Sequence, residues 1–89
     1  VMVADGYPGD YPRGDEIHGL DQIDSPNIKV FHAGTRTEHH KILTDGGRVL
    51  CVTALGQTLI DAQKNAYSGV GSVQWPGAGW RPDIGWRAV

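Results

Sequence analysis

The residues with the clearest capacity for chemistry lie in the stretch TDGGRVLCVTALG, residues 44–56. Gly46 and Gly47 stand directly before Arg48 and an apolar run. Consecutive glycines let backbone N–H groups face an anion without interference from side chains. The planar guanidinium of an arginine matches the oxygens of a phosphate. A structural interpretation is equally open, in which the glycines form a hairpin turn and Arg48 pairs with an acid.

The histidines and the single cysteine favour structural roles. His39 and His40 are adjacent, so in a strand their rings point to opposite faces, and a metal ion would need other ligands. His32 falls on a predicted strand, where a hydrogen-bonded structural histidine is commoner than a catalytic base. Cys51 falls inside the apolar run, where we expect an inert core thiol.

Neither the acids of the first loop nor the known reactive motifs indicate a catalytic or metal site. Asp10, Asp15 and Glu16 could hold a hard cation, but their spacing matches no calcium-loop pattern, so we expect solvated turns. The sequence contains no G-x-x-x-x-G-K-[ST] phosphate loop, no H-x-x-x-H or C-x-x-C spacing and no G-x-S-x-G elbow. We therefore expect no catalytic residue, no metal site and no ATP site in this chain.

Composition limits the class of protein. A chain of 89 residues makes one domain, and its 13 glycines indicate many turns and strand ends. A net charge of −2 argues against a nucleic-acid partner. No apolar stretch approaches the ~20 residues of a membrane span, and one cysteine favours a reducing compartment such as the cytoplasm. Because the chain opens directly on the strand-like VMVA, we expect it to be excised from a longer protein.

The elements that must position Arg48 can be predicted from periodicity. Thr58 is a suitable N-cap with Asp61 in the first helical turn, and Gly69 and Gly71 are expected to end the helix. Asp45-Gly46-Gly47 predicts a hairpin turn after residues 41–44, and residues 35–40 read as a polar connection. The run after Arg48 is apolar on both faces, which predicts a central, buried strand. The expected strands are 1–4, 28–34, 41–44, 49–55 and an edge strand at 72–75.

The predicted fold class is therefore α+β, a small and mainly antiparallel sheet of about five short strands with one covering helix. The tail is rich in turns. Trp80 and Trp86 are expected to close the core, and Asp83 could pair with Arg81 or Arg87 to pin the terminus.

Three motifs, in order along the chain, carry a resemblance to a known family. They are GYPGDYPRGDEIHGL near the start, VFHAGT followed by TDGGRVLCVTALG in the middle, and DIGWRA at the end. Together they resemble the C-terminal domain of the phosphoribosylamine–glycine ligases, members of the ATP-grasp superfamily. Each motif alone is weak, but their shared order and spacing over essentially all 89 residues make the resemblance specific.

The resemblance implies an enzyme that joins glycine to 5-phosphoribosylamine in de novo purine biosynthesis, with ATP cleaved to ADP and phosphate. ATP and magnesium (or manganese) would be held by grasp domains that precede this region. Residues 1–89 would then form a single substrate-side domain that packs against those domains and is inactive alone. The alternative is a free-standing module that binds a phosphate ligand or a partner and has no ligase activity.

The resemblance also implies specific substrate contacts. In related ligases of purine synthesis a Gly-Arg turn at the head of a strand contacts the ribose phosphate. GGRVL stands at the matching place, which implies that Gly46, Gly47 and Arg48 bind substrate. The loop Tyr7, Pro8 and Gly9 would line the same cleft. The family more often has Asn in place of Asp45, whose carboxylate would repel a phosphate unless it turns away or pairs with Arg48.

Overall fold

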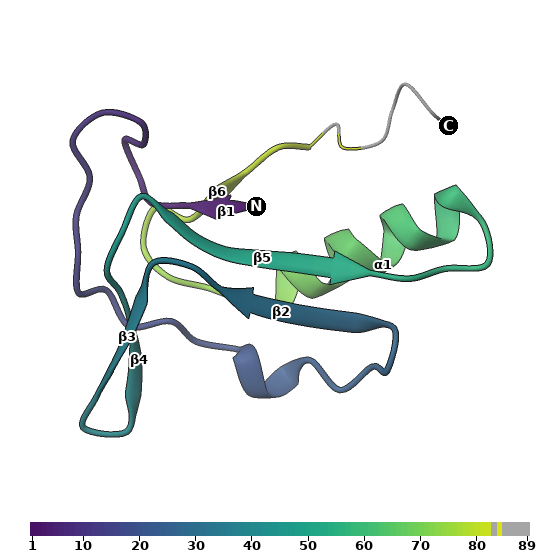
Figure 1. Ribbon diagram of the computed structural model, residues 1–89, viewed down its shortest axis with the longest axis horizontal. Helices are drawn as coiled ribbons and strands as arrows, with labels where there is room; N and C mark the ends of the chain where they lie inside the picture. The colour runs from purple at the N-terminus through teal and green to yellow at the C-terminus, as the bar shows by residue number, and fades with distance from the viewer. Residues whose placement is uncertain (83, 85–89) are drawn as a thin grey trace.

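A computed structural model of the protein describes residues 1–82 and 84 (Figure 1). Within these residues the chain forms two antiparallel sheets, one α-helix and one short 3-10 helix, so the predicted α+β class is confirmed. In chain order the elements are β1 (Met2–Val3), η1 (Leu20–Gln22), β2 (Ile28–His32), β3 (Thr35–Glu38), β4 (Lys41–Thr44), β5 (Arg48–Ala54), α1 (Leu59–Ser72) and β6 (Gly79–Trp80).

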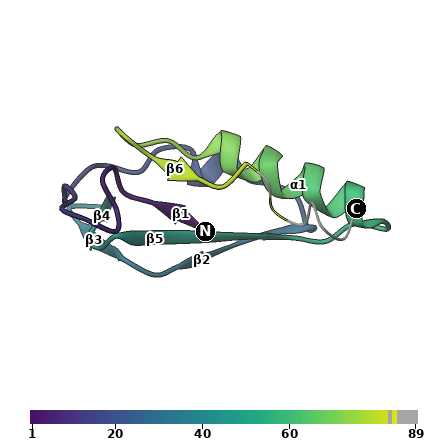
Figure 2. The same cartoon turned by 90° about the horizontal axis from the view of Figure 1, so that it is seen from above.

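The larger sheet has the strand order β2-β5-β1-β6, which places β5 between two partners and confirms it as a central strand. Its pairing with β2 runs from Ile28 opposite Ala54 to His32 opposite Leu50. Its first residue, Arg48, lies opposite Val3 of β1. α1 lies over one face of this sheet (Figure 2). Only the first half of β5 is buried as predicted, because Thr53 is exposed and Cys51, Val52 and Ala54 are only partly buried.

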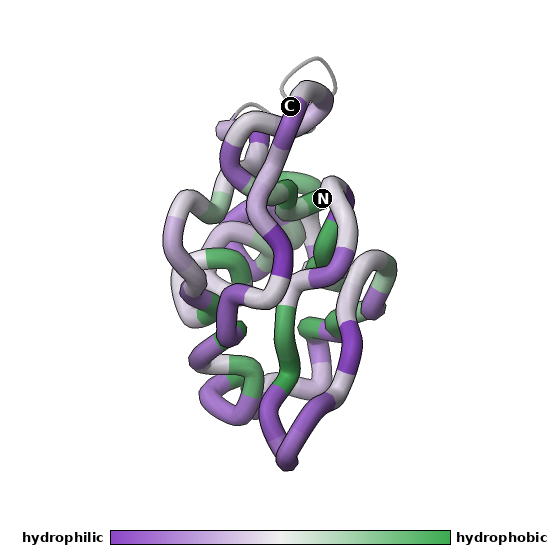
Figure 3. The backbone as a smooth tube through the Cα atoms, turned by 90° about the vertical axis from the view of Figure 1, so that its left-hand side faces the viewer, coloured by the Kyte–Doolittle hydropathy of each residue, from purple (hydrophilic) through white to green (hydrophobic). Residues whose placement is uncertain are grey.

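The predicted hairpin turn at residues 45–47 is wrong, because β4 does not pair with β5. It pairs instead with β3 in a separate two-stranded sheet, so residues 35–40 are a strand and a turn, not a connection. His39 and His40 form that turn with φ of 51° and 65°. Two consecutive positive φ angles are the geometry of a tight two-residue hairpin. Figure 3 shows this hairpin with a hydrophilic tip and a hydrophobic stretch along β4.

The helix α1 begins where the sequence predicts and ends later. The Thr58 hydroxyl accepts a hydrogen bond from the Asp61 backbone N–H at 3.1 Å, which confirms the N-cap. The predicted end at Gly69 and Gly71 is wrong, because the helix continues to Ser72. A Cβ added at Gly69 would lie 2.9 Å from Val52 Cγ1, so this glycine lets the helix approach the sheet.

The C-terminal part of the described chain also differs from the sequence prediction. The predicted edge strand at 72–75 is wrong, because within this range only Gln74 forms an isolated bridge, with His18. The strand β6 instead forms one edge of the larger sheet. Trp80 is 43% exposed and does not close the core, whereas Trp75 is 6% exposed and does. Trp86, Asp83 and Arg87, with the pairing expected of them, lie outside the described residues. The buried core comprises Met2, Ala4, Ile17, Val49, Leu50, Val70, Val73 and Trp75.

The two helical glycines should respond oppositely to alanine. Gly69→Ala forces a methyl group against Val52 and Ile28, and we expect the free energy of unfolding to fall by about 1–3 kcal/mol. Gly71→Ala meets no atom within 4 Å and should raise it by about 0.5–1 kcal/mol through helix propensity. Urea denaturation of both variants measures the difference, and a shift of the same sign in both would contradict this packing.

Candidate functional site

A cavity of about 590 Å³ opens where the start of the chain, the end of β2 and the start of β5 meet. It brings together three of the predicted site residues, Tyr7, Gly47 and Arg48. The other three, Pro8, Gly9 and Gly46, do not line it. The full lining is Val1, Tyr7, Tyr11, Ala33, Gly34, Gly47, Arg48, Leu50 and Cys51.

Gly46 and Gly47 serve first as sites of close backbone packing. A Cβ on Gly34 would lie 2.8 Å from the Gly46 Cα, so the segment after β2 touches the segment before β5. A Cβ on Gly47 would overlap the ring of Tyr7, which therefore packs directly on the glycine backbone. The two glycines thus replace the predicted hairpin turn with a crossing of two chain segments.

The hydrogen bonds of this crossing leave two amides without acceptors. The Asp45 N–H donates to the Gly34 carbonyl and the Ala4 N–H donates to the Gly47 carbonyl, each at 2.8 Å. The backbone N–H groups of Gly46 and Gly47 donate to no other described residue. Gly47 is buried and lines the cavity, so its backbone forms part of the wall beside which an anion would bind.

Arg48 is an exposed cation at the mouth of this cavity. Its guanidinium forms no ion pair with any acid in residues 1–82, so the structural alternative of an Arg48 salt bridge is not realised in that range. Arg48 also borders a second cavity of about 540 Å³, lined by Val1, Val3, Tyr7, Gly79, Trp80 and Arg81. The buried neighbours Val49 and Leu50, both 0% exposed, fix the backbone that carries it.

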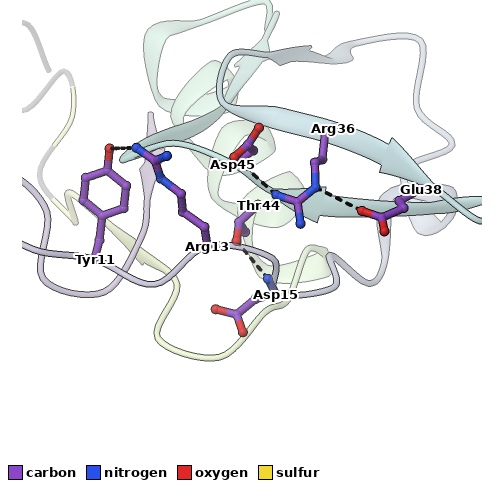
Figure 4. A network of polar contacts seen from close by, with 7 residues as sticks. All are labelled: Tyr11, Arg13, Asp15, Arg36, Glu38, Thr44 and Asp45. Atoms are coloured by element: carbon purple, nitrogen blue, oxygen red, sulfur yellow. Dashed lines mark hydrogen bonds and ion pairs between the residues drawn. The ribbon is translucent and has the colours of Figure 1, made fainter.

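A network of polar side chains beside the cavity was not indicated by the sequence (Figure 4). Arg36 lies between two carboxylates, with Nη1 3.2 Å from Asp45 Oδ1 and Nε 3.2 Å from Glu38 Oε2. Arg13 donates to the Tyr11 hydroxyl at 3.3 Å. This bond, followed by the charges of Tyr11 and Asp45, raises the pKa of Arg13.

Buried Thr44 ties the first loop to the strand that precedes Asp45. Its hydroxyl accepts from the Asp15 N–H at 3.0 Å, and its own N–H donates to the Asp15 carbonyl at 2.8 Å. The Gly14 N–H donates to the Thr44 carbonyl at 2.7 Å. The first loop therefore cannot move without disturbing the segment that leads to Arg48.

The remaining sequence candidates form no reactive cluster among the described residues, and Cys51 is not the core thiol that the sequence predicts. His32 Nδ1 contacts the Thr35 hydroxyl at 3.0 Å, and the pair His39-His40 forms the β3–β4 turn. Cys51 is partly buried and lines the cavity. Glu16 lies 3.9 Å from both His18 and Lys41.

Neither a metal centre nor a membrane span is found in the part of the chain that the structure describes. Its His, Cys, Asp and Glu side chains form no group of three or more that could hold a metal ion. None of its helices is long and apolar enough to cross a membrane.

The contact between Gly47 and Tyr7 can be tested directly. Gly47→Ala should lower the free energy of unfolding by about 1–3 kcal/mol, because the new methyl group displaces the ring. In a Tyr7→Ala background the same substitution should cost clearly less, since the obstructing ring is gone. Chemical denaturation of the four proteins measures both costs, and an equal cost in the two backgrounds would disprove the contact.

Comparison with known proteins places this geometry in a family. The family model described as "Phosphoribosylglycinamide synthetase, C domain" matches residues 1–87. The phosphoribosylamine–glycine ligase of Salmonella typhimurium is 53% identical over 90 residues, and that of Vibrio cholerae is 51% identical over 89. In each case the alignment covers 100% of this chain and 21% of the relative, so the chain spans about that share of these relatives' length.

A solved structure agrees with the sequence comparisons. The crystal structure of phosphoribosylamine–glycine ligase from Thermotoga maritima superimposes with a TM-score of 0.76 and 33% sequence identity. The match covers 93% of this chain and 20% of that protein. The near-complete family match, the sequence identities and the shared fold together show that this chain belongs to the phosphoribosylglycinamide synthetase C-domain family.

Proposed function

We propose that this chain is the substrate-side domain of a ligase that joins glycine to 5-phosphoribosylamine, with ATP cleaved to ADP and phosphate, in de novo purine biosynthesis. Family membership and the names of the relatives support this activity. Within the ligase, the cavity at Arg48 receives the ribose phosphate. The observation that carries this assignment is that Arg48 and Gly47 line one cavity, where the Arg48 guanidinium and the Gly47 amide have no partner among the described residues.

The residues of this chain bind and orient the phosphoribosyl group. The Arg48 guanidinium offers parallel N–H donors to phosphate oxygens, and the Gly47 N–H adds a fixed dipole. Tyr7 and Tyr11, whose ring centroids lie 6.3 Å apart, form an aromatic wall beside them. Because Arg48 begins a strand paired on both sides, the phosphate is held by a rigid element, and the amine of the sugar is directed toward the rest of the enzyme.

The described residues do not fit ATP or a magnesium or manganese ion. They provide no cluster of metal-binding side chains, and the sequence has no phosphate loop. We therefore place ATP, the metal ion and the glycine site in the ATP-grasp portion of the ligase, against which this domain packs. On this proposal residues 1–89 are one domain, which works in the cytoplasm and has no ligase activity alone.

Replacing Arg48 should weaken phosphoribosylamine binding selectively. In a full-length ligase that carries this domain, Arg48→Ala removes a charged hydrogen-bonded contact worth roughly 1.5–3 kcal/mol, so the KM for phosphoribosylamine should rise about 10- to 150-fold. The KM values for ATP and glycine should stay near those of the parent protein. Steady-state kinetics with each substrate varied in turn measure the three constants.

Two further variants sharpen the test. Arg48→Lys keeps the charge and loses the planar fork, so its KM should fall between those of the parent and Arg48→Ala. Lys29→Ala removes another exposed cation, which lies 5.7 Å from the Phe31 ring centre on β2, and should leave all three constants unchanged. An unaltered phosphoribosylamine constant in Arg48→Ala would remove Arg48 from the site.

A further inference from the structure

Asp45 sets an electrostatic problem for the proposed phosphate site. It directly precedes Gly46, Gly47 and Arg48, so its carboxylate belongs to the same short segment as the proposed anion-binding groups. A phosphate dianion and an uncompensated carboxylate repel each other, and the repulsion extends over about 10 Å at 0.1 M salt. Binding at Arg48 therefore requires that the negative charge of Asp45 be held and offset elsewhere.

Arg36 meets this requirement from the neighbouring hairpin. Its Nη1 lies 3.2 Å from Asp45 Oδ1, and its Nε lies 3.2 Å from Glu38 Oε2. The guanidinium therefore bridges β3 and the segment between β4 and β5 (Figure 4). A Cβ on Gly14 would lie 3.3 Å from Nη2, so the guanidinium also rests against the first loop. Asp45 thus pairs with a cation outside the cavity and leaves Arg48 unpaired.

Two cations lie near Asp45 besides Arg48. Arg36 pairs with both Asp45 and Glu38, and the charge of Asp45 also acts on Arg13. The side chains of Arg36 and Asp45 are 40% and 39% exposed, and an ion pair this open contributes little to folding stability. The pair nevertheless places a positive charge beside Asp45, which offsets the carboxylate at the segment that leads to Arg48.

We propose that Arg36 is a positioning residue for the phosphate site: it holds the Asp45 carboxylate in an ion pair directed toward β3, so that the full charge of Arg48 acts on the substrate. Arg36 touches no substrate and acts through Asp45. The inference rests on the proposed function, because it concerns the same phosphate group.

A double-mutant cycle in a full-length ligase carrying this domain tests the inference. Arg36→Ala frees the Asp45 carboxylate, and the KM for phosphoribosylamine should rise about three- to tenfold at low salt. Asp45→Asn should change it by less than about twofold, and the double variant Arg36→Ala/Asp45→Asn should return to that level. The kcat and the KM for ATP should be unchanged in all three, and the effect of Arg36→Ala should shrink at about 0.5 M salt.

Two single variants serve as controls. Arg36→Lys keeps the charge beside Asp45 and should hold the KM near that of the parent. Glu38→Gln removes the other partner of the same guanidinium, on the strand side, and should leave the KM unchanged.

The outcomes separate this inference from the proposed function. If the double variant keeps the raised KM of Arg36→Ala, Arg36 acts through the fold and the inference is wrong. If Arg48→Ala raises the KM while Arg36→Ala does not, the phosphate site stands and only the role of Arg36 falls. If Arg48→Ala leaves the KM unchanged, the phosphate site at Arg48 falls, and the role of Arg36 falls with it.

Discussion

The crossing of two chain segments at Gly34 and Gly46 is the contact on which the rest of the site depends. The backbone after β2 passes so close to the backbone before β5 that Gly34 has no room for a side chain and Gly46 has little. Two hydrogen bonds, from Ala33 and Gly34 to the Val49 carbonyl at 3.0 and 3.2 Å, hold the crossing on one side. The hydrogen bond from the Asp45 N–H to the Gly34 carbonyl holds the crossing on the other side. The intervening residues must then leave the main sheet, and they form the β3–β4 hairpin.

Arg48 gains its position from this crossing and from the burial that follows it. The strand enters the core one residue after Arg48, where Val49 and Leu50 are fully buried. The side chain of Arg48 therefore stands at a boundary between solvent and a rigid interior. A cation at such a boundary keeps its hydration in the free protein, while its backbone has already lost the freedom that binding would otherwise remove.

The sequence predicts the regular elements well where local chemistry decides them. The Thr58 cap and the apolar run of β5 are local signals; the cap is confirmed, and the run is confirmed as a central strand of which the first half is buried. The hairpin at 45–47 was mispredicted because Asp-Gly-Gly is a turn signal only when nothing distant packs on it, and here Gly34 and Tyr7 do. His39-His40 carries no usual turn residue, so its hairpin was missed.

The candidate site was predicted in part for the same reason. Arg48, Gly47 and Tyr7 come together as the motifs indicated, whereas Arg36 has no sequence signal, because its partner Asp45 becomes its neighbour only once β3 folds back on β4.

The packing of Gly46 and Gly47 separates the residues that this fold favours from those that a ligand would require. Gly47 is favoured by the packing of the Tyr7 ring, and Gly46 lies close against the Gly34 backbone, whatever the cavity holds. A relative of this domain without a ligand would keep these two packing contacts, yet nothing among the described residues would oblige it to keep the arginine that follows them. The glycines thus reflect the architecture, and on the proposed function the arginine reflects what the cavity binds.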